Sequence, residues 1–272
     1  MQKKLEIDDH LLKLITNKNV VAVDPDNKII YLEREEKEDV VKFTAHGYKV
    51  YTVGEINFVG TNAGKYVMPI GCSPADIIDG NTAVTALHCV ADADMQPRKS
   101  TTMFVINDAL PEVAKVEASL KSYTPVKKCG WLCKLFMFFR RLPKTYINLR
   151  EVAWLETPVN LNNYKPLPKL ETIGVLTATN AKGDYMIFSP LPGKEDKIRP
   201  GVRIAYISYN YRENRTAYTE TVITGYVLTN IVGFIFYLPY AYEPGKVLAI
   251  PGYSGSAVKL IYINNSSELS NV

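Results

Sequence analysis

Short apolar runs rich in Val, Ile, Tyr and Phe recur along most of this chain, and glycine, proline or charged residues separate them. Runs of this length and composition are typical of β-strands. They lie at residues 40–45, 48–53, 56–60, 66–70, 82–87, 103–106, 152–155, 173–178, 185–188, 202–209, 219–228, 232–238 and 257–263. Short strands at such regular spacing predict an all-β protein built from sandwiches or barrels.

Helical signals are concentrated at the N-terminus. Residues 8–17 place apolar side chains at helical spacing behind Asp8, a good N-cap residue, and predict a short amphipathic helix. Residues 28–42 are rich in charge and predict a solvated linker or an outer edge. The body is expected to start near Val40, and a proline-rich stretch at 158–170 is expected to divide it into two halves.

Composition excludes several classes of protein. Of the 272 residues, 47% are hydrophobic and 22% are charged, which is ordinary for a folded globular protein. The net charge of +4 is too small to argue for a nucleic-acid partner. No apolar stretch reaches the roughly 20 residues of a membrane-spanning helix, and the N-terminus lacks the apolar core of a signal peptide.

Two short segments could carry chemistry. His88 is one of three histidines; it ends an apolar run and is followed at once by Cys89. Far downstream, Ser254 stands between Gly252 and Gly255. Such glycines permit a sharp turn that exposes a hydroxyl and aims backbone N–H groups at one point. A serine nucleophile also needs a base such as histidine, and that base needs a carboxylate.

Taken singly, both segments have ordinary explanations. A Gly-x-Ser-Gly sequence occurs in many β-turns, and a histidine at the end of a strand is more often structural. Their combination, with the histidine before the serine on an all-β chain of this size, is a much stronger indication of a nucleophile and its base.

Three stretches resemble the chymotrypsin/trypsin-like serine proteases of the PA clan. Residues 85–89 (Thr-Ala-Leu-His-Cys) resemble that family's Thr-Ala-Ala-His-Cys signature. Residues 252–256 (Gly-Tyr-Ser-Gly-Ser) are similar to its Gly-Asp-Ser-Gly-Gly signature. Residues 151–155 (Glu-Val-Ala-Trp-Leu) resemble the strand that carries the family's acid, and residues 157–168 resemble the linker between its barrels. The resemblance covers residues 40–265 and keeps the family's order of histidine, acid and serine.

The resemblance implies two antiparallel β-barrels of the six-stranded type. The first barrel, at 40–157, would carry the histidine and the acid, and the second, at 171–272, would carry the serine. The linker lies at 158–170, and residues 1–39 form a short helical extension. In the implied mechanism Ser254 attacks a peptide carbonyl, His88 transfers the proton and Glu151 orients His88. The N–H groups of Gly252 and Ser254 would hold the oxyanion, and no cofactor or metal is needed.

The acid and the cysteines depart from a simple match. Glu151 replaces the family's aspartate and follows His88 by 63 residues, a gap that an insertion at 125–144 would absorb. Asp108 is the alternative acid, although 20 residues leave little chain for a strand to return. Cys72 precedes Cys89 by 17 residues, and the family often closes the histidine loop with a disulfide at similar spacing. Two buried thiols are the alternative in a reducing compartment.

The C-terminal end is the largest departure. Only 18 residues follow Ser254, whereas the family continues through two strands and a helix that wall the substrate pocket. The second barrel is therefore expected to be truncated, unless the N-terminal extension fills the gap or the chain is a fragment. Leu248 is placed near the pocket floor, where no acidic residue supports a preference for Lys or Arg, so an apolar or aromatic preference is expected. Tyr253 replaces the aspartate of zymogens, so activation by N-terminal cleavage is not expected.

Residues 131–141, which include Trp131, Phe136 and Arg141, combine aromatic and basic side chains. An inserted hairpin that packs on the first barrel explains them, and the alternative is contact with a membrane interface.

The sequence thus predicts a serine endopeptidase that acts on protein or peptide substrates. A catalytically inactive, protease-like binding module is the alternative. Ser256, in the place of the family's second glycine, resembles viral and some bacterial members. Together with the missing signal peptide it favours a viral or intracellular origin, and nothing in the sequence sets an oligomeric state.

Overall fold

A computed structural model describes most of the chain. The described residues are 8–52, 56–58, 75–91, 95–107, 110–126, 147–148, 150–165, 167–180, 182–210, 213, 215–231, 234–250 and 252–261. Strands dominate these residues and helices are few, which confirms the all-β prediction.

The larger of two sheets has twelve strands. They are β1 (Val20–Asp24), β2 (Ile29–Leu32), β3 (Lys49–Thr52), β4 (Ile56–Phe58), β9 (Ile147–Asn148), β11 (Glu171–Asn180), β12 (Tyr185–Pro190), β13 (Arg203–Asn210), β14 (Arg215–Val222), β15 (Gly225–Ile231), β16 (Phe234–Tyr242) and β17 (Ala257–Leu260). The order along the sheet is β14-β13-β17-β11-β12-β16-β15-β1-β2-β3, and β4 pairs with β11 and β9 with β16. The pairs β2–β3 and β9–β16 are parallel, and the other recorded pairs are antiparallel.

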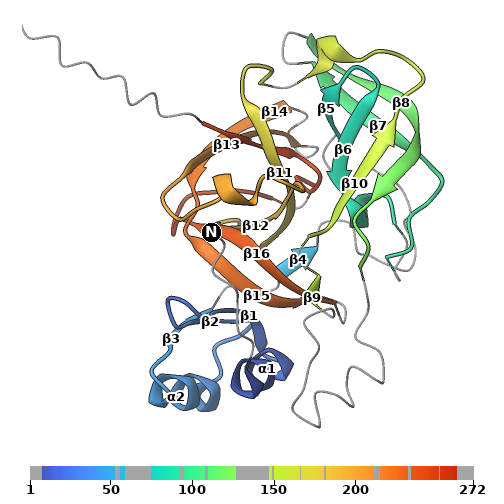
Figure 1. Ribbon diagram of the computed structural model, residues 1–272. Helices are drawn as coiled ribbons and strands as arrows, with labels where there is room; N and C mark the ends of the chain where they lie inside the picture. The colour runs from blue at the N-terminus through green and yellow to red at the C-terminus, as the bar shows by residue number, and fades with distance from the viewer. Residues whose placement is uncertain are drawn as a thin grey trace, which may run out of the picture.

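The smaller sheet has five strands in the order β5-β6-β10-β8-β7. These are β5 (Asp76–Asp79), β6 (Thr82–Ala86), β7 (Ser100–Asn107), β8 (Leu110–Tyr123) and β10 (Val152–Glu156). The helices are α1 (Asp9–Thr16) and α2 (Lys37–Ala45), with 3-10 turns η2 (Leu87–Cys89), η4 (Asn162–Tyr164) and η5 (Glu195–Lys197). Figure 1 shows the two sheets side by side, with α1, α2 and β1–β3 at the far end of the larger one.

The two predicted barrels are not confirmed. Among the described residues, the strand pairings form two sheets and no closed barrel. Segment 40–157 supplies the whole smaller sheet, but its strands β3, β4 and β9 pair within the larger one. The division of the chain into domains at 39, 157 and 170 stays a prediction.

The N-terminal segment differs from its predicted form in part. Helix α1 is confirmed, and the Asp8 carboxylate caps it by accepting a hydrogen bond from the N–H of Leu11 at 2.8 Å. Residues 40–45 belong to helix α2, so the predicted strand is wrong. Acidic side chains in the first turn and Lys42 in the last suit the helix macrodipole. Phe43 is buried and Val40 packs partly buried against the same core cluster, whereas Val41 is 69% exposed, so only one face of the helix contacts the core.

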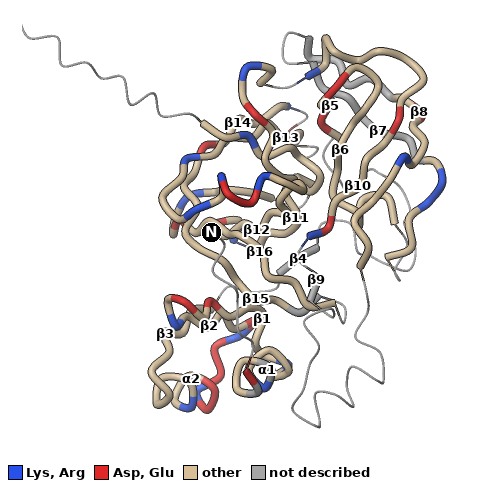
Figure 2. The backbone as a smooth tube through the Cα atoms, in the orientation of Figure 1, with Lys and Arg blue, Asp and Glu red and all other residues tan. Residues whose placement is uncertain are grey.

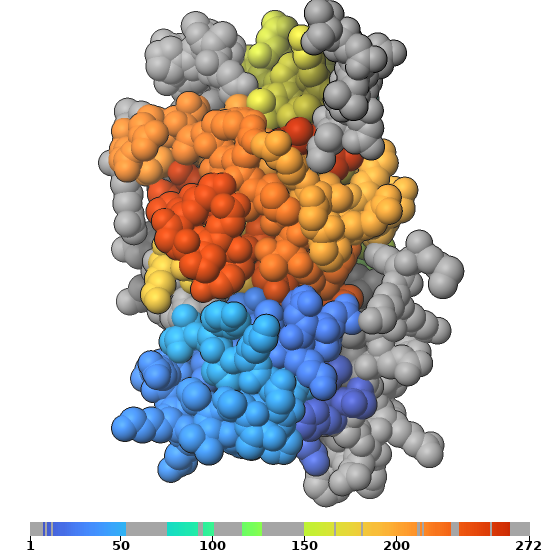
Figure 3. Space-filling model, turned by 90° about the vertical axis from the view of Figure 1, so that its left-hand side faces the viewer, coloured from blue at the N-terminus to red at the C-terminus, as the bar shows by residue number. Residues whose placement is uncertain are grey.

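Residues 28–42 are not a linker either, because buried strand β2 lies within them. Strand β1 joins this N-terminal unit to the larger sheet by pairing with β15. The hydroxyl of Thr229 on β15 also donates to the carbonyl of Val21 at 2.8 Å. Leu14, Val23, Phe43 and other apolar side chains share one core cluster with Leu228 and Ile235 of the larger sheet. Figure 3 shows the resulting close packing of the N-terminal unit against that sheet.

Strands β13 and β14 precede Ser254 in the sequence, but in the larger sheet they lie on the outer side of β17, the strand that follows Ser254. Strand β17 begins three residues after Ser254 and pairs with β13 through Ala205 opposite Lys259. Strand β13 pairs in turn with β14 along its whole length. The larger sheet therefore continues past β17 with an upstream hairpin, although the sequence suggested that strands would be missing at this place.

A buried ion pair crosses between the two sheets. Asp76 on β5 and Lys259 on β17 lie 2.6 Å apart, and each side chain is only 1% exposed. The hydroxyl of Thr172 on β11 completes the group, at 3.1 Å from Asp76 and 2.8 Å from Lys259. Burial raises the pKa of the Asp76 carboxyl, and the Lys259 ammonium opposes that shift. The pair ties the hairpin that leads to His88 to the strand that follows Ser254.

Acidic and basic positions are interspersed over both sheets and the N-terminal unit, as Figure 2 shows. No helix in the described part of the chain has both the length and the apolar character needed to span a membrane.

Candidate functional site

His88 lies where the smaller sheet ends. Strand β6 is buried from Ala83 to Ala86 and then gives way to the 3-10 turn η2, which buries His88. Strand β10 runs antiparallel to β6 with Val152 opposite Ala86. Glu151, the residue just before β10, is therefore brought beside the residue that follows β6, so the two strands place the histidine and the carboxylate together.

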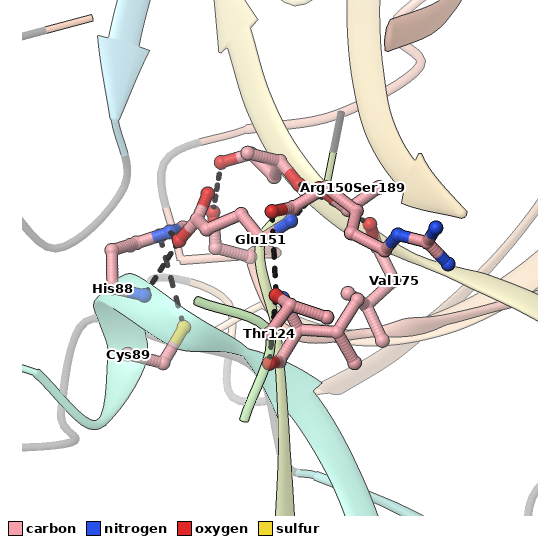
Figure 4. Close-up of polar contacts among 10 residues, drawn as sticks. His88, Cys89, Thr124, Arg150, Glu151, Val175 and Ser189 are labelled. Carbon is pink, nitrogen blue, oxygen red and sulfur yellow. Dashed lines mark hydrogen bonds and ion pairs between the residues drawn. The ribbon is translucent and has the colours of Figure 1, made fainter. Parts of the chain in front are cut away.

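His88 and Glu151 are joined by two hydrogen bonds to one oxygen. The backbone N–H of His88 donates to Oε1 of Glu151 at 2.5 Å, and the imidazole Nδ1 contacts the same oxygen. Both side chains are buried, with exposed fractions of 1% and 0%. Figure 4 shows the His88 ring turned toward the carboxylate. Two contacts from one residue fix the position of the ring relative to its carboxylate.

This contact sets the tautomer of His88. A carboxylate only accepts hydrogen bonds, so Nδ1 carries the proton that it shares with Glu151. In the neutral imidazole Nε2 is then the acceptor and can act as a general base. The sulfur of Cys89 lies 3.7 Å from Nε2, on the same side of the ring.

Glu151 is held by the larger sheet as well. Its backbone N–H donates to the hydroxyl of Ser189 on β12 at 3.0 Å. Its second oxygen, Oε2, is buried and has no hydrogen-bond partner among the described residues. A buried carboxylate is costly unless it is paired, and the recorded partner of this carboxylate is His88. Glu151 therefore faces His88 as its buried hydrogen-bond acceptor.

Ser254 lies in a tight turn of the larger sheet, just before β17. Gly252 and Gly255 have φ angles of 109° and 87°, a region that side chains with a Cβ rarely adopt. The turn is attached to β11 by reciprocal hydrogen bonds: the N–H of Gly255 donates to the carbonyl of Leu176, and the N–H of Leu176 donates to the carbonyl of Ser256, both at 2.8 Å. The predicted glycine-framed turn is thus confirmed as local structure.

The hydroxyl of Ser254 is fully buried and donates to the carbonyl of Thr177 at 2.8 Å. Among the described residues no direct hydrogen bond joins Ser254 to His88. The neighbouring strand residues hold the two parts of the site separately: the hydroxyl of Thr177 donates to Ser189 at 3.1 Å, and Ser189 accepts from the backbone N–H of Glu151. Ser254 contacts the backbone carbonyl of Thr177, so Thr177 and Ser189 link the segments that carry Ser254 and Glu151 without a continuous chain of hydrogen bonds.

Two backbone N–H groups in the serine turn have no hydrogen-bond acceptor among the described residues. They belong to Gly252 and Ser254. Both residues are buried, and a buried N–H without a partner is rare because it costs free energy. These are the two N–H groups that the sequence assigned to an oxyanion.

Other candidates from the sequence stand as follows. Leu248 is buried in a core cluster of the larger sheet, and its carbonyl accepts from the hydroxyl of Tyr206 at 2.6 Å. Cys89 is the one cysteine among the described residues. Cys72, Asp108 and residues 131–141 lie outside the described residues, so the disulfide, the alternative acid and the membrane contact stay predictions. No group of three or more His, Cys, Asp or Glu in the described residues is arranged to hold a metal ion.

Sequence reasoning missed the residues that connect the two halves of the site. Ser189, Thr177 and Ser208 lie within strands and have no glycine frame or signature around them. The buried serines of the described residues are Ser189, Ser208, Ser254 and Ser256, and each has a hydrogen-bond partner, as buried polar groups ordinarily do. These partners come from distant parts of the chain, so they become apparent only in the folded structure.

The described residues thus combine an all-β fold with a buried His88–Glu151 pair and a glycine-framed serine turn. A family model described as "Putative filamentous viruses peptidase" matches residues 44–260, well over half of the chain. The chain belongs to this viral peptidase family. No curated protein matches it.

Proposed function

We propose that this viral peptidase-family protein is a serine endopeptidase that uses His88, Glu151 and Ser254. The observation that carries the proposal is the buried His88–Glu151 pair, which leaves Nε2 as the basic nitrogen. Ser189 accepts from the backbone N–H of Glu151 and from the hydroxyl of Thr177, the residue whose carbonyl accepts from Ser254, which supports the proposal that the three residues share one site. The family match supports protein or peptide substrates.

The proposed first step begins with a rotation of the Ser254 side chain. Its hydroxyl leaves the carbonyl of Thr177 and turns toward Nε2 of His88, a change between staggered rotamers. Catalytic hydrogen bonds often form fully only when substrate is bound. Oγ then attacks the peptide carbonyl while Nε2 takes the hydroxyl proton, and Glu151 stabilises the imidazolium.

In the following step the C–N bond breaks and the imidazolium returns its proton to the leaving amine. Water then attacks the acyl-enzyme, with His88 as the base, and releases the acid and the free serine. The unpaired N–H groups of Gly252 and Ser254 are the proposed oxyanion donors in both steps. None of these steps needs a cofactor.

The finer features of the fold belong to the same proposal. The two open sheets correspond to the two halves of a chymotrypsin-like protease, with the site where they meet. Leu248 shares a core cluster with Tyr253 of the serine turn and would line the base of the substrate pocket. A Cys72–Cys89 disulfide would fix the turn that carries His88.

A protease-like binding module without activity is the competing function. The buried hydroxyl of Ser254, bonded to Thr177, is the observation that favours it. The two functions differ in one respect: only an enzyme activates Ser254 through His88.

Covalent labelling with a fluorophosphonate probe tests the proposal. Attack by Ser254 forms an O–P bond and expels fluoride, and His88 accepts the hydroxyl proton. We expect one adduct on Ser254 of the folded protein, located by mass mapping. Ser254→Ala and His88→Ala should both abolish it.

Ser119→Ala is the matched control, because Ser119 is exposed on β8 in the smaller sheet. It should label at the wild-type rate. A folded wild-type protein that gives no adduct would reject the enzyme and leave the binding module. An adduct that survives in His88→Ala would reject His88 as the base.

A further inference from the structure

Ser256 and Ser208 form a second pair of buried hydroxyls behind the serine turn. Ser256 is two residues beyond Ser254 and is 1% exposed, and Ser208 on β13 is fully buried. Their hydroxyl oxygens are 2.7 Å apart. The hydroxyl of Ser256 is also 2.7 Å from the carbonyl oxygen of Tyr253. Neither serine has a role in the proposed mechanism so far.

The number of available protons fixes which group donates in each of these hydrogen bonds. A carbonyl oxygen can only accept, so Ser256 donates its single hydroxyl proton to Tyr253. The hydrogen bond between the two serines must then use the proton of Ser208. The carbonyl of Tyr253 also accepts from the backbone N–H of Ser256 at 3.1 Å. Two donors from Ser256 therefore hold this carbonyl in place.

The carbonyl of Tyr253 and the N–H of Ser254 belong to the same peptide group. That group is planar and trans, so its C=O and N–H point in opposite directions. Fixing the carbonyl on one side therefore aims the N–H on the other. This N–H is one of the two proposed oxyanion donors, and no described residue accepts from it.

We infer that Ser256 and Ser208 are positioning residues that aim the Ser254 N–H at the oxyanion. The inference rests on the proposed serine mechanism and adds β13 to the site. It explains a departure from the resembled signature, which has glycine where this chain has Ser256. A glycine there would keep the turn but would remove the hydroxyl that holds the carbonyl of Tyr253. The upstream hairpin β13–β14 thus supplies Ser208 as a second polar support behind the serine turn.

Kinetics of fluorophosphonate labelling test the inference, because the P=O group of the probe occupies the oxyanion position. Removal of an entire oxyanion donor costs about 10²- to 10³-fold in rate, so misdirection of one should cost about tenfold. We expect Ser256→Ala and Ser256→Gly to lower the maximal labelling rate constant by about tenfold each, and Ser208→Ala by a smaller factor. The probe concentration at half-maximal rate and the pH dependence of labelling should not change, because His88 and Glu151 are untouched.

The double variant Ser208→Ala, Ser256→Ala tests whether the two hydroxyls act through the same carbonyl. If the two hydroxyls act in series, Ser208→Ala should add nothing to the effect of Ser256→Ala. Thr229→Ala, which removes a buried hydroxyl from the junction with β1, is the matched control and should label normally. Wild-type rates in folded Ser256→Ala and Ser208→Ala, or independent losses in the double variant, would overturn the inference while the triad stands. A wild-type protein that does not label would overturn the triad, and the inference with it.

Discussion

The backbone N–H of Glu151 donates to the hydroxyl of Ser189, so the residue whose carboxylate contacts His88 is itself held by the opposite sheet. Glu151 precedes β10 of the smaller sheet, whereas Ser189 lies on β12 of the larger one. Ser189 also accepts from the hydroxyl of Thr177, the residue whose backbone carbonyl accepts from Ser254. The relative position of the two sheets and the geometry of the site are therefore coupled.

Ser189→Ala should weaken both stability and labelling. The change leaves the N–H of Glu151 buried without its acceptor, which costs about 1–3 kcal/mol in the free energy of unfolding. Labelling of Ser254 should slow because the carboxylate beside His88 is less well fixed. Denaturant unfolding measures the loss of stability, and probe kinetics measure the loss of labelling rate. Ser122→Ala, at an exposed position of β8, is the control. Unchanged stability would mean that water or another group replaces the lost acceptor.

Glu151→Gln tests the tautomer argument. The amide keeps the size of the side chain but offers a donor as well as an acceptor to His88. When its oxygen keeps the backbone N–H of His88 and its NH₂ group faces the ring, Nδ1 must accept and Nε2 carries the proton, which is the wrong tautomer for a base. Replacing the triad acid by its amide costs about 10⁴-fold in chymotrypsin-type enzymes, and we expect a loss of labelling rate of about 10³- to 10⁴-fold.

Glu156→Gln is the matched control for this change, because Glu156 is exposed at the other end of the same strand. Its labelling rate should equal that of the wild type. If Glu151→Gln labels normally, Glu151 is not the orienting acid, and Asp108 becomes the candidate to test next.

Replacing one residue of the buried pair Asp76–Lys259 should destabilise the protein more than replacing both. Lys259→Met leaves a carboxylate buried without its counter-charge, which costs about 3–5 kcal/mol. The double variant Asp76→Leu, Lys259→Met removes both charges and should recover much of that loss. Equilibrium unfolding of the wild type, both single variants and the double variant completes the cycle.

An exposed ion pair provides a comparison for the cost of breaking the buried pair. Lys246 and Glu243 lie 3.0 Å apart with side chains 46% and 36% exposed, so Lys246→Met should cost less than about 1 kcal/mol. Equal losses in Lys246→Met and Lys259→Met would contradict the buried arrangement.

Part of the fold and of the site could be predicted from the sequence because the signals are local. The turn around Ser254 is predictable because Gly252 and Gly255 flank it. Both have positive φ angles, which glycine adopts readily. Asp8 likewise marks the start of α1. Residues 40–45 were misassigned because Val40, Val41 and Phe43 have strand propensity, while the charges around them favour a helix.

Long-range contacts could not be predicted in the same way. Ser189 meets Glu151 across 38 residues, and Asp76 meets Lys259 across 183. Such pairs depend on how two sheets meet, and a single sequence carries no periodicity that specifies it. Lys259 offered one signal, since a lysine inside an apolar strand must find a partner when it is buried.

Alkaline pH should ionise tyrosines whose pKa is raised in the folded protein, and the half-buried Tyr226 provides the test. Burial, followed by the nearby charge of Glu195, raises the pKa of Tyr226 to about 12, above its ordinary value near 10. A pKa raised in the folded state contributes stability that is present below the unfolded pKa and is lost as pH rises through the folded one. Between pH 10 and 12 the wild type should therefore lose stability, by at most about 1.4 kcal/mol per pH unit from this group.

Tyr226→Phe should lose less stability than the wild type over that range, because it has no hydroxyl to ionise at this position. At neutral pH it should be slightly less stable, since the hydroxyl of Tyr226 donates to the carbonyl of Ile198 at 3.0 Å. Urea unfolding at a series of pH values measures both differences, and the phenolate absorbance of folded protein reports the ionisation directly. Identical pH dependence in the two proteins would show that Tyr226 ionises equally well in the folded and the unfolded chain.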